Sequence, residues 1–220
     1  MSLIVVTGGA RAGKSSFAQQ LALQLGGDRD VCCVATAEPG DEEMRTRIAA
    51  HRAARPPGWR TIEAPHSVVP ALAVLANPLT IRVVLLDCMT LLVSNVLLSA
   101  FGTKADRPIN LGGHPPSVPN TPAQPAQGET VEDIWPAVEA EVNALIRFAA
   151  SAATTVVITN EVGLGIVPDN RLARVYRDLV GRANQRLAAS AAFVYLVVAG
   201  IPIEIKAMQS SLSHILGDRN

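Results

Sequence analysis

The stretch GGARAGKS, residues 8–15, decides the fold of this 220-residue chain. It follows a short apolar run at residues 3–6 and precedes residues 15–25, in which apolar residues recur at helical spacing. The pattern is G-x-x-x-x-G-K-[ST] between a strand and a helix, which is the context that a P-loop requires. In a P-loop the glycines let backbone N–H groups curl around a phosphate chain at the positive end of a helix. The stretch therefore predicts a nucleotide-binding protein, in which Lys14 would reach the terminal phosphates and Ser15 would ligate Mg²⁺.

Apolar runs of strand length alternate with helical patterns along most of the chain. Further strands are predicted at residues 31–35, 83–86, 155–159 and 193–198, with a short edge strand at 203–205. Helices are predicted at residues 41–55, 132–152 and 170–189. This alternation is typical of an α/β fold, with a mostly parallel sheet and helices on both faces. The length suits a single nucleotide-binding domain over residues 1–220.

Composition narrows the class of protein. Apolar residues make up 49% and charged residues 17%, so a sizeable core can form. Nineteen basic residues balance nineteen acidic ones, which argues against a general binder of nucleic acid or of anionic membranes. No apolar run is long enough to span a bilayer, and the first residues lack the features of a signal peptide. Three cysteines without metal-ligand spacing indicate reduced thiols, so we expect a cytoplasmic protein.

One segment, from about residue 102 to residue 130, breaks the alternation. It is rich in Pro, Gly, Asn and Ala and shows no periodicity. Such a segment cannot bury enough apolar surface to offset its ordering entropy, so we predict a flexible insert within the single domain. The residues after Lys206 are predicted to form a short amphipathic helix.

The predicted strand at residues 83–86 is closed by Asp87. An acid at the tip of an apolar strand in a P-loop protein serves Mg²⁺, directly or through water. Asp87 is therefore a candidate metal or nucleotide residue. The alternative is a helix cap, because Thr90 and Asn95 nearby also have the character of turn or cap residues.

Arg47, His51 and Arg55 follow one another at a spacing of four residues in the predicted helix at 41–55, so they lie along one stripe. Guanidinium groups can hold an oxyanion and disfavour a protonated imidazole, which would keep His51 nucleophilic. The alternative is a solvated face in which Glu43 pairs with Arg47 and His51 lies at the surface. Spacing alone favours the solvated face.

Asn160 and Glu161 follow the predicted strand at 155–159. In an open parallel sheet, ligands bind at the carboxyl ends of the strands. Glu161 is therefore placed to meet a nucleotide, a metal or an acceptor hydroxyl, or alternatively to cap the next helix. The other histidines are isolated, and neither a Ser-His-Asp arrangement nor a zinc pattern is present.

Three further motifs accompany the P-loop in order: D-E-E-M-R-T-R-I-x-x-H-R-x-x-R-P at residues 41–56, LLDCMTLLVSN at 85–95, and N-E-V-G-x-G-I-V-P at 160–168. Together they closely resemble the bifunctional adenosylcobinamide kinase / adenosylcobinamide-phosphate guanylyltransferase family of cobalamin biosynthesis. The resemblance covers nearly the whole chain apart from roughly residues 101–132 and the tail after Lys206.

The resemblance implies a RecA-like P-loop fold and two reactions. The first phosphorylates the aminopropanol hydroxyl of adenosylcobinamide with ATP or GTP. The second transfers GMP from GTP to that phosphate, through a GMP–histidine intermediate that falls on His51. The catalytic residues would be His51 and Lys14. Mg²⁺ is expected to bind at Ser15 and Asp87. The nucleotide-contacting positions implied are Gly8, Gly9, Ala10, Arg11, Ala12, Gly13, Lys14, Ser15, Ala35, Thr36, Ala37, Arg52, Ala53, Ala54, Arg55, Glu63 and Asp87.

The expected partners are GTP, ATP, adenosylcobinamide and its phosphate, and the family resemblance also implies a homo-oligomer, with a trimer expected. Ala12 departs from the serine usual in the family, and Ala192-Phe193 lacks the acid often found before the last long strand. Two other functions stay open from the residues alone. One is a single-function P-loop kinase of a small alcohol, in which His51 would only bind phosphate. The other is a nucleotide-gated regulatory module that modifies no small molecule.

Overall fold

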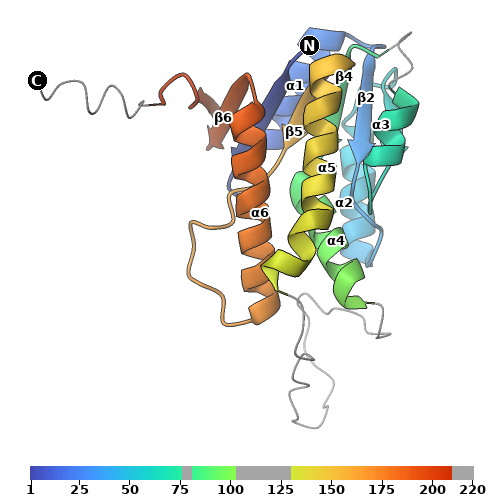
Figure 1. Cartoon of the computed structure of the whole chain (residues 1–220). Helices are drawn as coiled ribbons and strands as arrows, with labels where there is room; N and C mark the ends of the chain where they lie inside the picture. The colour runs from blue at the N-terminus through green and yellow to red at the C-terminus, as the bar shows by residue number, and fades with distance from the viewer. Residues whose placement is uncertain (76–80, 103–129, 210–220) are drawn as a thin grey trace, which may run out of the picture.

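A seven-stranded sheet forms the centre of the molecule (Figure 1). The computed structural model describes residues 1–75, 81–102 and 130–209. The strand order is β3-β2-β4-β5-β1-β6-β7, and all neighbours are parallel except the antiparallel pair β6–β7. The strands are β1 (Leu3–Gly8), β2 (Val31–Ala35), β3 (Arg60–Glu63), β4 (Val83–Asp87), β5 (Thr154–Ile158), β6 (Phe193–Val198) and β7 (Ile201–Glu204).

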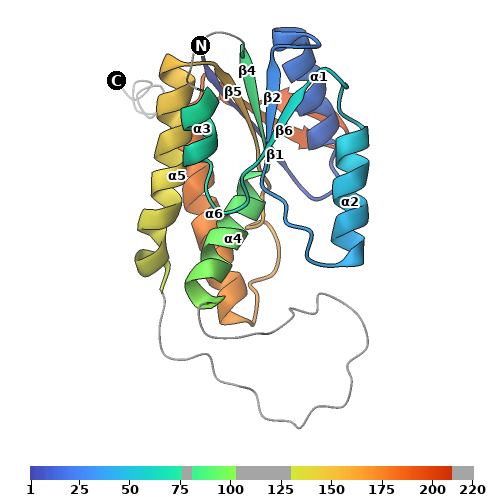
Figure 2. The same cartoon turned by 90° about the vertical axis from the view of Figure 1, so that its right-hand side faces the viewer.

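Helices cover both faces of the sheet, as predicted. They are α1 (Lys14–Gly26), α2 (Glu42–Ala53), α3 (Val69–Leu75), α4 (Met89–Gly102), α5 (Val131–Ser151) and α6 (Arg171–Ser190). Figure 2 shows α1 and α2 on one side of the sheet and α3 to α6 on the other. Strand β5 separates the P-loop strand β1 from β4, which ends in Asp87. This is the arrangement of a RecA-like P-loop protein, so the predicted fold class is confirmed.

Alternation along β1 explains why the sheet needs helices on two sides. Leu3 and Val5 belong to the core shared with α4, α5 and α6, whereas Ile4 and Val6 pack with Ala18 of α1 on the other face. All four of these side chains are buried, which is the pattern of a parallel strand inside an α/β fold. Helix α2 differs from the others because none of its residues is buried.

The strongly patterned elements were predicted well. The strands at 31–35 and 193–198 match β2 and β6, and the helix at 41–55 corresponds to α2, where the Asp41 side chain caps the Met44 N–H at 2.7 Å. Strand β3 and helices α3 and α4 were not predicted. β3 is short and largely exposed, α3 is short and contains Pro70, and the apolar run of α4 has no clear helical periodicity.

Thr90 and Asn95 lie inside α4, so the interpretation of both as turn or cap residues was wrong. Residues 103–129, which carry the predicted insert, and residues 210–220 of the predicted terminal helix lie outside the described residues. None of the helices in the described part is both long enough and apolar enough to cross a membrane.

The three cysteines are free, as the sequence predicts. Burial raises the pKa of the Cys32 thiol to about 11 and that of Cys33 to about 12. Because the thiolate is the reactive form, both thiols are inert at neutral pH.

A buried carboxylate joins α5 to the start of α3. Glu141 is 8% exposed and accepts hydrogen bonds from the Ser67 hydroxyl and the Val68 N–H, both at 2.7 Å. Replacing Glu141 by alanine leaves a buried N–H without its acceptor, so the free energy of unfolding should fall by about 2 kcal/mol. Urea denaturation measures this. The control is Glu139→Ala on the same helix, whose contact with Arg186 is 3.9 Å long, and which should change stability by less than about 0.5 kcal/mol. Equal effects of the two variants would contradict the prediction.

Candidate nucleotide-binding and catalytic site

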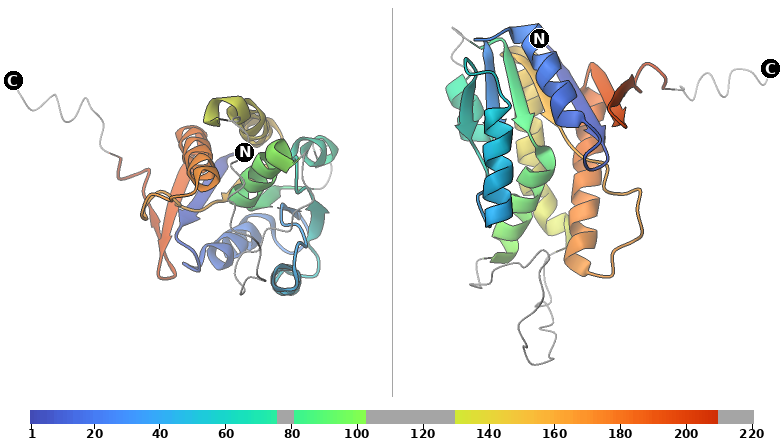
Figure 3. Two further views of the ribbon diagram at one scale, coloured as in Figure 1. Left: turned by 90° about the horizontal axis from the view of Figure 1, so that it is seen from below. Right: turned by 180° about the vertical axis from the view of Figure 1, so that it is seen from behind.

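The carboxyl ends of the parallel strands gather most of the predicted site residues at one edge of the sheet. The P-loop follows β1, and Asp87 ends β4. Pairing aligns Ala35 of β2 with Asp87 on one side and with Glu63 of β3 on the other. Helix α2 lies beside α1 on the same face of the sheet (Figure 3). The strand order thus brings together positions that are far apart in the sequence, as a ligand site in an open α/β sheet requires.

The β6–β7 hairpin contacts the backbone of the P-loop and supports it. Gly8 has φ +146°, and a Cβ there would lie 2.4 Å from the Val197 carbonyl oxygen. The Gly200 N–H at the hairpin turn donates to the Ala12 carbonyl at 2.8 Å. Since the hydrogen bond uses only the backbone of Ala12, the absence of serine there leaves this support intact.

Gly8→Ala should therefore destabilise the protein, because it combines an unfavourable φ with a backbone clash. We expect the free energy of unfolding to fall by about 3 kcal/mol. Gly9→Ala is the matched control, since a Cβ at Gly9 meets nothing within 4 Å. It should change stability by less than about 1 kcal/mol. Thermal unfolding of both variants without nucleotide measures the difference, and a Gly8→Ala protein as stable as Gly9→Ala would show that the hairpin does not confine the loop.

Lys14 is buried, with 7% of its surface exposed, and its Nζ donates to the Gly9 carbonyl at 2.5 Å. Burial lowers the pKa of this ammonium; the Cys88 thiol opposes the shift and Arg47 adds to it. A buried ammonium needs an acceptor, and the loop carbonyl supplies one. The charge interaction with Arg47 also indicates that this part of α2 faces the P-loop.

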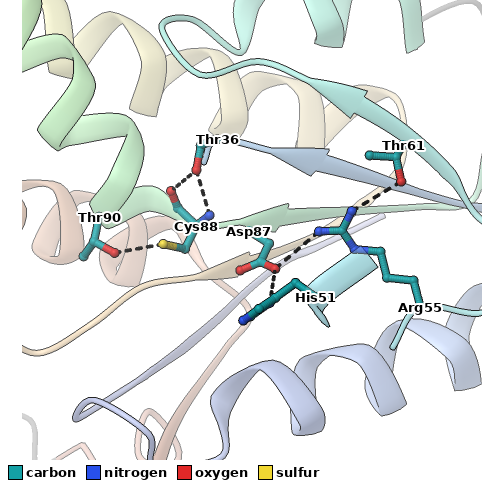
Figure 4. A network of polar contacts seen from close by, with 7 residues as sticks. All are labelled: Thr36, His51, Arg55, Thr61, Asp87, Cys88 and Thr90. Carbon is teal, nitrogen blue, oxygen red and sulfur yellow. Dashed lines mark hydrogen bonds and ion pairs between the residues drawn. The ribbon is translucent and has the colours of Figure 1, made fainter. Parts of the chain in front are cut away.

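A cluster of charged side chains links α2 to the tip of β4 (Figure 4). The Oδ2 atom of Asp87 lies 3.4 Å from Nδ1 of His51 and 3.6 Å from Nη2 of Arg55. The Asp87 side chain is 12% exposed and that of His51 is 33% exposed. His51 thus remains accessible while its ring is directed toward a nearly buried carboxylate.

Arg55 is the most buried member of this cluster, with a side chain only 7% exposed. Its Nη1 donates to the Thr61 hydroxyl at 3.4 Å, but its buried Nε has no hydrogen-bond partner within the described structure. An unsatisfied guanidinium N–H beside a histidine is suited to an anionic ligand.

The stripe predicted over residues 47–55 is only partly a feature of the helix: Arg47 and His51 lie in α2, whereas Arg55 lies beyond its last residue, Ala53. Among the described residues, Glu43 and Arg47 form no ion pair, and Glu42 pairs with Arg45 instead. The solvated face with a Glu43–Arg47 pair, which was the alternative for this helix, is therefore not observed. Arg52 forms an ion pair with Glu63, so two predicted nucleotide positions meet. Ala53 and Ala54 are exposed at the end of α2.

Two side chains to which the sequence analysis gave other roles, Thr36 as a nucleotide contact and Asn95 as a turn or cap residue, fix the loop after β4. The Thr36 hydroxyl donates to the Cys88 carbonyl at 2.7 Å and accepts from the Cys88 N–H at 2.8 Å (Figure 4). The Asn95 amide donates to the carbonyls of Thr36 and Pro65, each at 2.9 Å. An Asn in an otherwise apolar helix is the signal that could have revealed this role. These bonds hold the backbone next to Asp87.

Glu161 lies beneath the P-loop and does not cap α6, because Asn170 serves as that cap. Its carboxylate accepts from the Thr7 hydroxyl at 2.9 Å and from the Asn184 amide at 3.1 Å. Its backbone N–H donates to the Gly8 carbonyl at 3.2 Å. Glu161 thus ties the base of the P-loop to α6.

His66 is not isolated, contrary to the sequence-based interpretation. Its Nε2 lies 2.8 Å from Oε1 of Glu38, and its Nδ1 is 3.4 Å from the Ser99 hydroxyl. A shallow groove of about 500 Å³ adjoins it, lined by Ile62, Glu63, Pro65, His66, Pro70 and Val74 among others. Within the described residues, no three His, Cys, Asp or Glu side chains are grouped as a metal site.

The donor set at the P-loop nevertheless suits Mg²⁺. A P-loop metal is held by one hydroxyl, one carboxylate, substrate phosphates and water, all of them oxygen ligands. Ser15 at the start of α1 and Asp87 at the tip of β4 are of these types, and both come from the carboxyl edge of the sheet.

A P-loop between β1 and α1, an acid at the tip of β4 and a histidine directed toward that acid define an enzyme that transfers groups from nucleoside triphosphates. The chain belongs to the cobinamide kinase / cobinamide phosphate guanyltransferase family, whose model matches residues 4–205. The predicted family is thus confirmed, and the enzyme is a transferase.

Curated relatives agree over nearly the whole chain. The bifunctional adenosylcobalamin biosynthesis protein CobU of Escherichia coli (strain K12) is 40% identical over 205 residues, which cover 93% of this chain and 99% of the relative. The bifunctional adenosylcobalamin biosynthesis protein CobP of Pseudomonas aeruginosa is 34% identical over 203 residues, covering 92% and 96%. Among solved structures, the ATPase domain of G40P aligns with a TM-score of 0.45 and 13% identity, over 89% of this chain and 68% of that one.

Proposed function

We propose that this enzyme phosphorylates adenosylcobinamide with ATP or GTP, and then transfers GMP from GTP to the phosphate to give adenosylcobinamide-GDP. Membership of the cobinamide kinase / cobinamide phosphate guanyltransferase family supports both reactions. The observation that carries the second reaction is the accessible His51, which faces Asp87 and Arg55 on the side of the sheet where α1 and the P-loop lie.

In the guanylyl step, the imidazole of His51 attacks the α-phosphorus of GTP and pyrophosphate leaves. The backbone of the P-loop and Lys14 stabilise the charge on the departing phosphates. Nζ of Lys14 donates to the Gly9 carbonyl of the loop, and a phosphate oxygen can replace that carbonyl as the acceptor. The corrinoid phosphate then displaces GMP from His51.

In the kinase step, the same P-loop positions the γ-phosphate for attack by the aminopropanol hydroxyl. Ser15 and Asp87 would hold Mg²⁺, which supplies neutralising charge to the phosphates. Arg52, Arg55 and Glu63 would contact the nucleotide. We also expect a cytoplasmic homo-oligomer, with a trimer expected from the family.

Product analysis tests this function. The protein is incubated with adenosylcobinamide, Mg²⁺ and either ATP or GTP. The corrinoids are then separated, and their masses are determined by mass spectrometry. We expect adenosylcobinamide phosphate with either nucleotide, and adenosylcobinamide-GDP with pyrophosphate only when GTP is present. Phosphate transfer without guanylylation would identify a single-function kinase. Nucleotide hydrolysis without a modified corrinoid would identify a regulatory module.

A further inference from the structure

The contact between Asp87 and His51 distinguishes the two nitrogens of the imidazole. Nδ1 faces Oδ2 of Asp87 at 3.4 Å (Figure 4), whereas Nε2 has no hydrogen bond or ion pair to the described residues. An ionised carboxylate only accepts hydrogen bonds, so a neutral ring beside it is stabilised with its proton on Nδ1. The lone pair is then on Nε2.

The position of Asp87 is well fixed, as an orienting group requires. Its backbone lies in β4, the next residue is held twice by the Thr36 hydroxyl, and its Oδ2 also faces the buried guanidinium of Arg55 at 3.6 Å. The carboxylate is 12% exposed, so solvent screens it little. His51, by contrast, comes from α2, which has no buried residues. The polar contact therefore has a large share in setting the direction of the ring.

We propose that Asp87 is a positioning residue for His51, fixing Nδ1 as the protonated nitrogen and Nε2 as the nitrogen that receives GMP. This inference rests on the proposed guanylyl transfer. Positioning His51 would be a second role for Asp87, beside the proposed binding of Mg²⁺. The contact with His51 uses only Oδ2, so Oδ1 remains available for another ligand.

The step balances without a separate proton acceptor. The Nε2 lone pair forms the bond to the α-phosphorus, and the bond to the bridging oxygen breaks with its electron pair on pyrophosphate. The ring keeps its Nδ1 proton and becomes cationic, and the Asp87 carboxylate stabilises that charge. When the corrinoid phosphate attacks, the N–P bond breaks and its pair returns to Nε2, which restores the neutral ring. A GMP on Nδ1 would instead collide with the carboxylate.

The first test identifies the linkage in the wild-type protein. The chain is labelled with ¹⁵N-histidine and guanylylated with GTP and Mg²⁺, and the nitrogen coupled to ³¹P is assigned by NMR in mild base. We expect Nε2 of His51. A phosphorus on Nδ1 overturns the inference while leaving the proposed function intact. Failure to form any adduct contradicts the proposed function, and the second test then still decides the orientation.

The second test needs neither nucleotide nor metal. Histidine tautomers are read from ¹H–¹⁵N correlations at pH 9, well above the ordinary imidazole pKa of about 6.5. We expect His51 to carry its proton on Nδ1, and expect both Asp87→Ala and the isosteric Asp87→Asn to remove that preference. If Asp87 served only to hold a metal, the tautomer of the metal-free protein would not change between the wild type and these variants, and the inference would be wrong.

A matched control comes from the second carboxylate–histidine pair. Glu38→Gln should alter the signals of His66, whose Nε2 it faces at 2.8 Å, and leave those of His51 unchanged. His51→Gln assigns the His51 signals. A wild-type His51 protonated on Nε2, or one that responds to Glu38→Gln as strongly as to Asp87→Asn, overturns the proposal.

Discussion

Replacing Lys14 by alanine should abolish both activities while leaving the fold intact. In a P-loop, the lysine places a full positive charge at the terminal phosphates. Losing a single stabilising donor of this kind costs about 10²–10³-fold in rate, and here the same donor serves both reactions. Initial rates of phosphorylation and of guanylylation, measured with the same corrinoid, give the effect.

The stability of the Lys14→Ala variant follows from burial. A P-loop lysine without a bound phosphate is expected to be exposed to solvent, but Lys14 is only 7% exposed. Burial lowers the pKa of Lys14, so the unfolded chain binds this proton more strongly than the folded one. The stability linked to this group therefore rises with pH between the lowered pKa of the folded state and the ordinary lysine pKa of 10.5, and it is least at neutral pH. When the ammonium is removed, the Gly9 carbonyl still accepts a hydrogen bond from the Ala12 N–H. We expect the Tm to change by less than about 3 °C.

Lys206 is the matched control, because it uses the same group for a structural purpose. Its Nζ donates to the carbonyls of Ala188, Ala189 and Ala191 at the end of α6. Lys206→Ala should lower the free energy of unfolding by about 2 kcal/mol and leave the rate constants nearly unchanged. A Lys14→Ala protein that kept wild-type rates, or that melted as early as Lys206→Ala, would contradict the P-loop assignment of Lys14.

Local signals were sufficient for the fold class. The P-loop is recognisable from eight consecutive residues and their flanking elements, and Asp87 from its position at the end of an apolar run. Strand β3 could not be found in this way. Its residues RTIE lack apolar alternation, and it forms because β2 offers a parallel edge to pair with.

The stripe on α2 shows where spacing stops being informative. The four-residue interval predicts that Arg47, His51 and Arg55 share one helix face, but α2 ends at Ala53, so Arg55 lies beyond the helix. The interval could not show that β4 lies next to β2 and brings Asp87 against that face. Spacing alone therefore favoured a solvated face, with two guanidinium groups around an oxyanion as the alternative, whereas the described neighbour of His51 is a carboxylate.

The support of the P-loop backbone also comes from distant segments. Gly200 lies 187 residues after Gly13, yet its N–H bonds to the Ala12 carbonyl and its Cα lies 3.1 Å from where a Gly13 Cβ would be. Nothing in the motif itself specifies this support. The same holds for Glu161, since its partners Thr7 and Asn184 come from β1 and α6.

His51→Ala should separate the two reactions. Without the imidazole, the protein cannot form the covalent GMP adduct, so adenosylcobinamide-GDP should not appear. Phosphoryl transfer from the P-loop to a hydroxyl needs no covalent histidine, so part of the kinase activity should remain. The Asp87 carboxylate then keeps Arg55 as its neighbour, which limits the damage to the metal and nucleotide site.

The adduct itself gives the sharpest readout of this prediction. GTP labelled at the α-phosphate should leave label on the wild-type protein and release pyrophosphate before any corrinoid is added, whereas GTP labelled at the γ-phosphate should leave none. A phosphoramidate is lost in acid and survives in base, unlike a phosphate ester of serine or threonine. His66→Ala is the matched control: this histidine also faces a carboxylate, Glu38, and its side chain is 57% exposed. It should retain full labelling. Labelling of His51→Ala at the wild-type level, or loss of label only in His66→Ala, would exclude His51 as the nucleophile and reduce its role to a contact for phosphate.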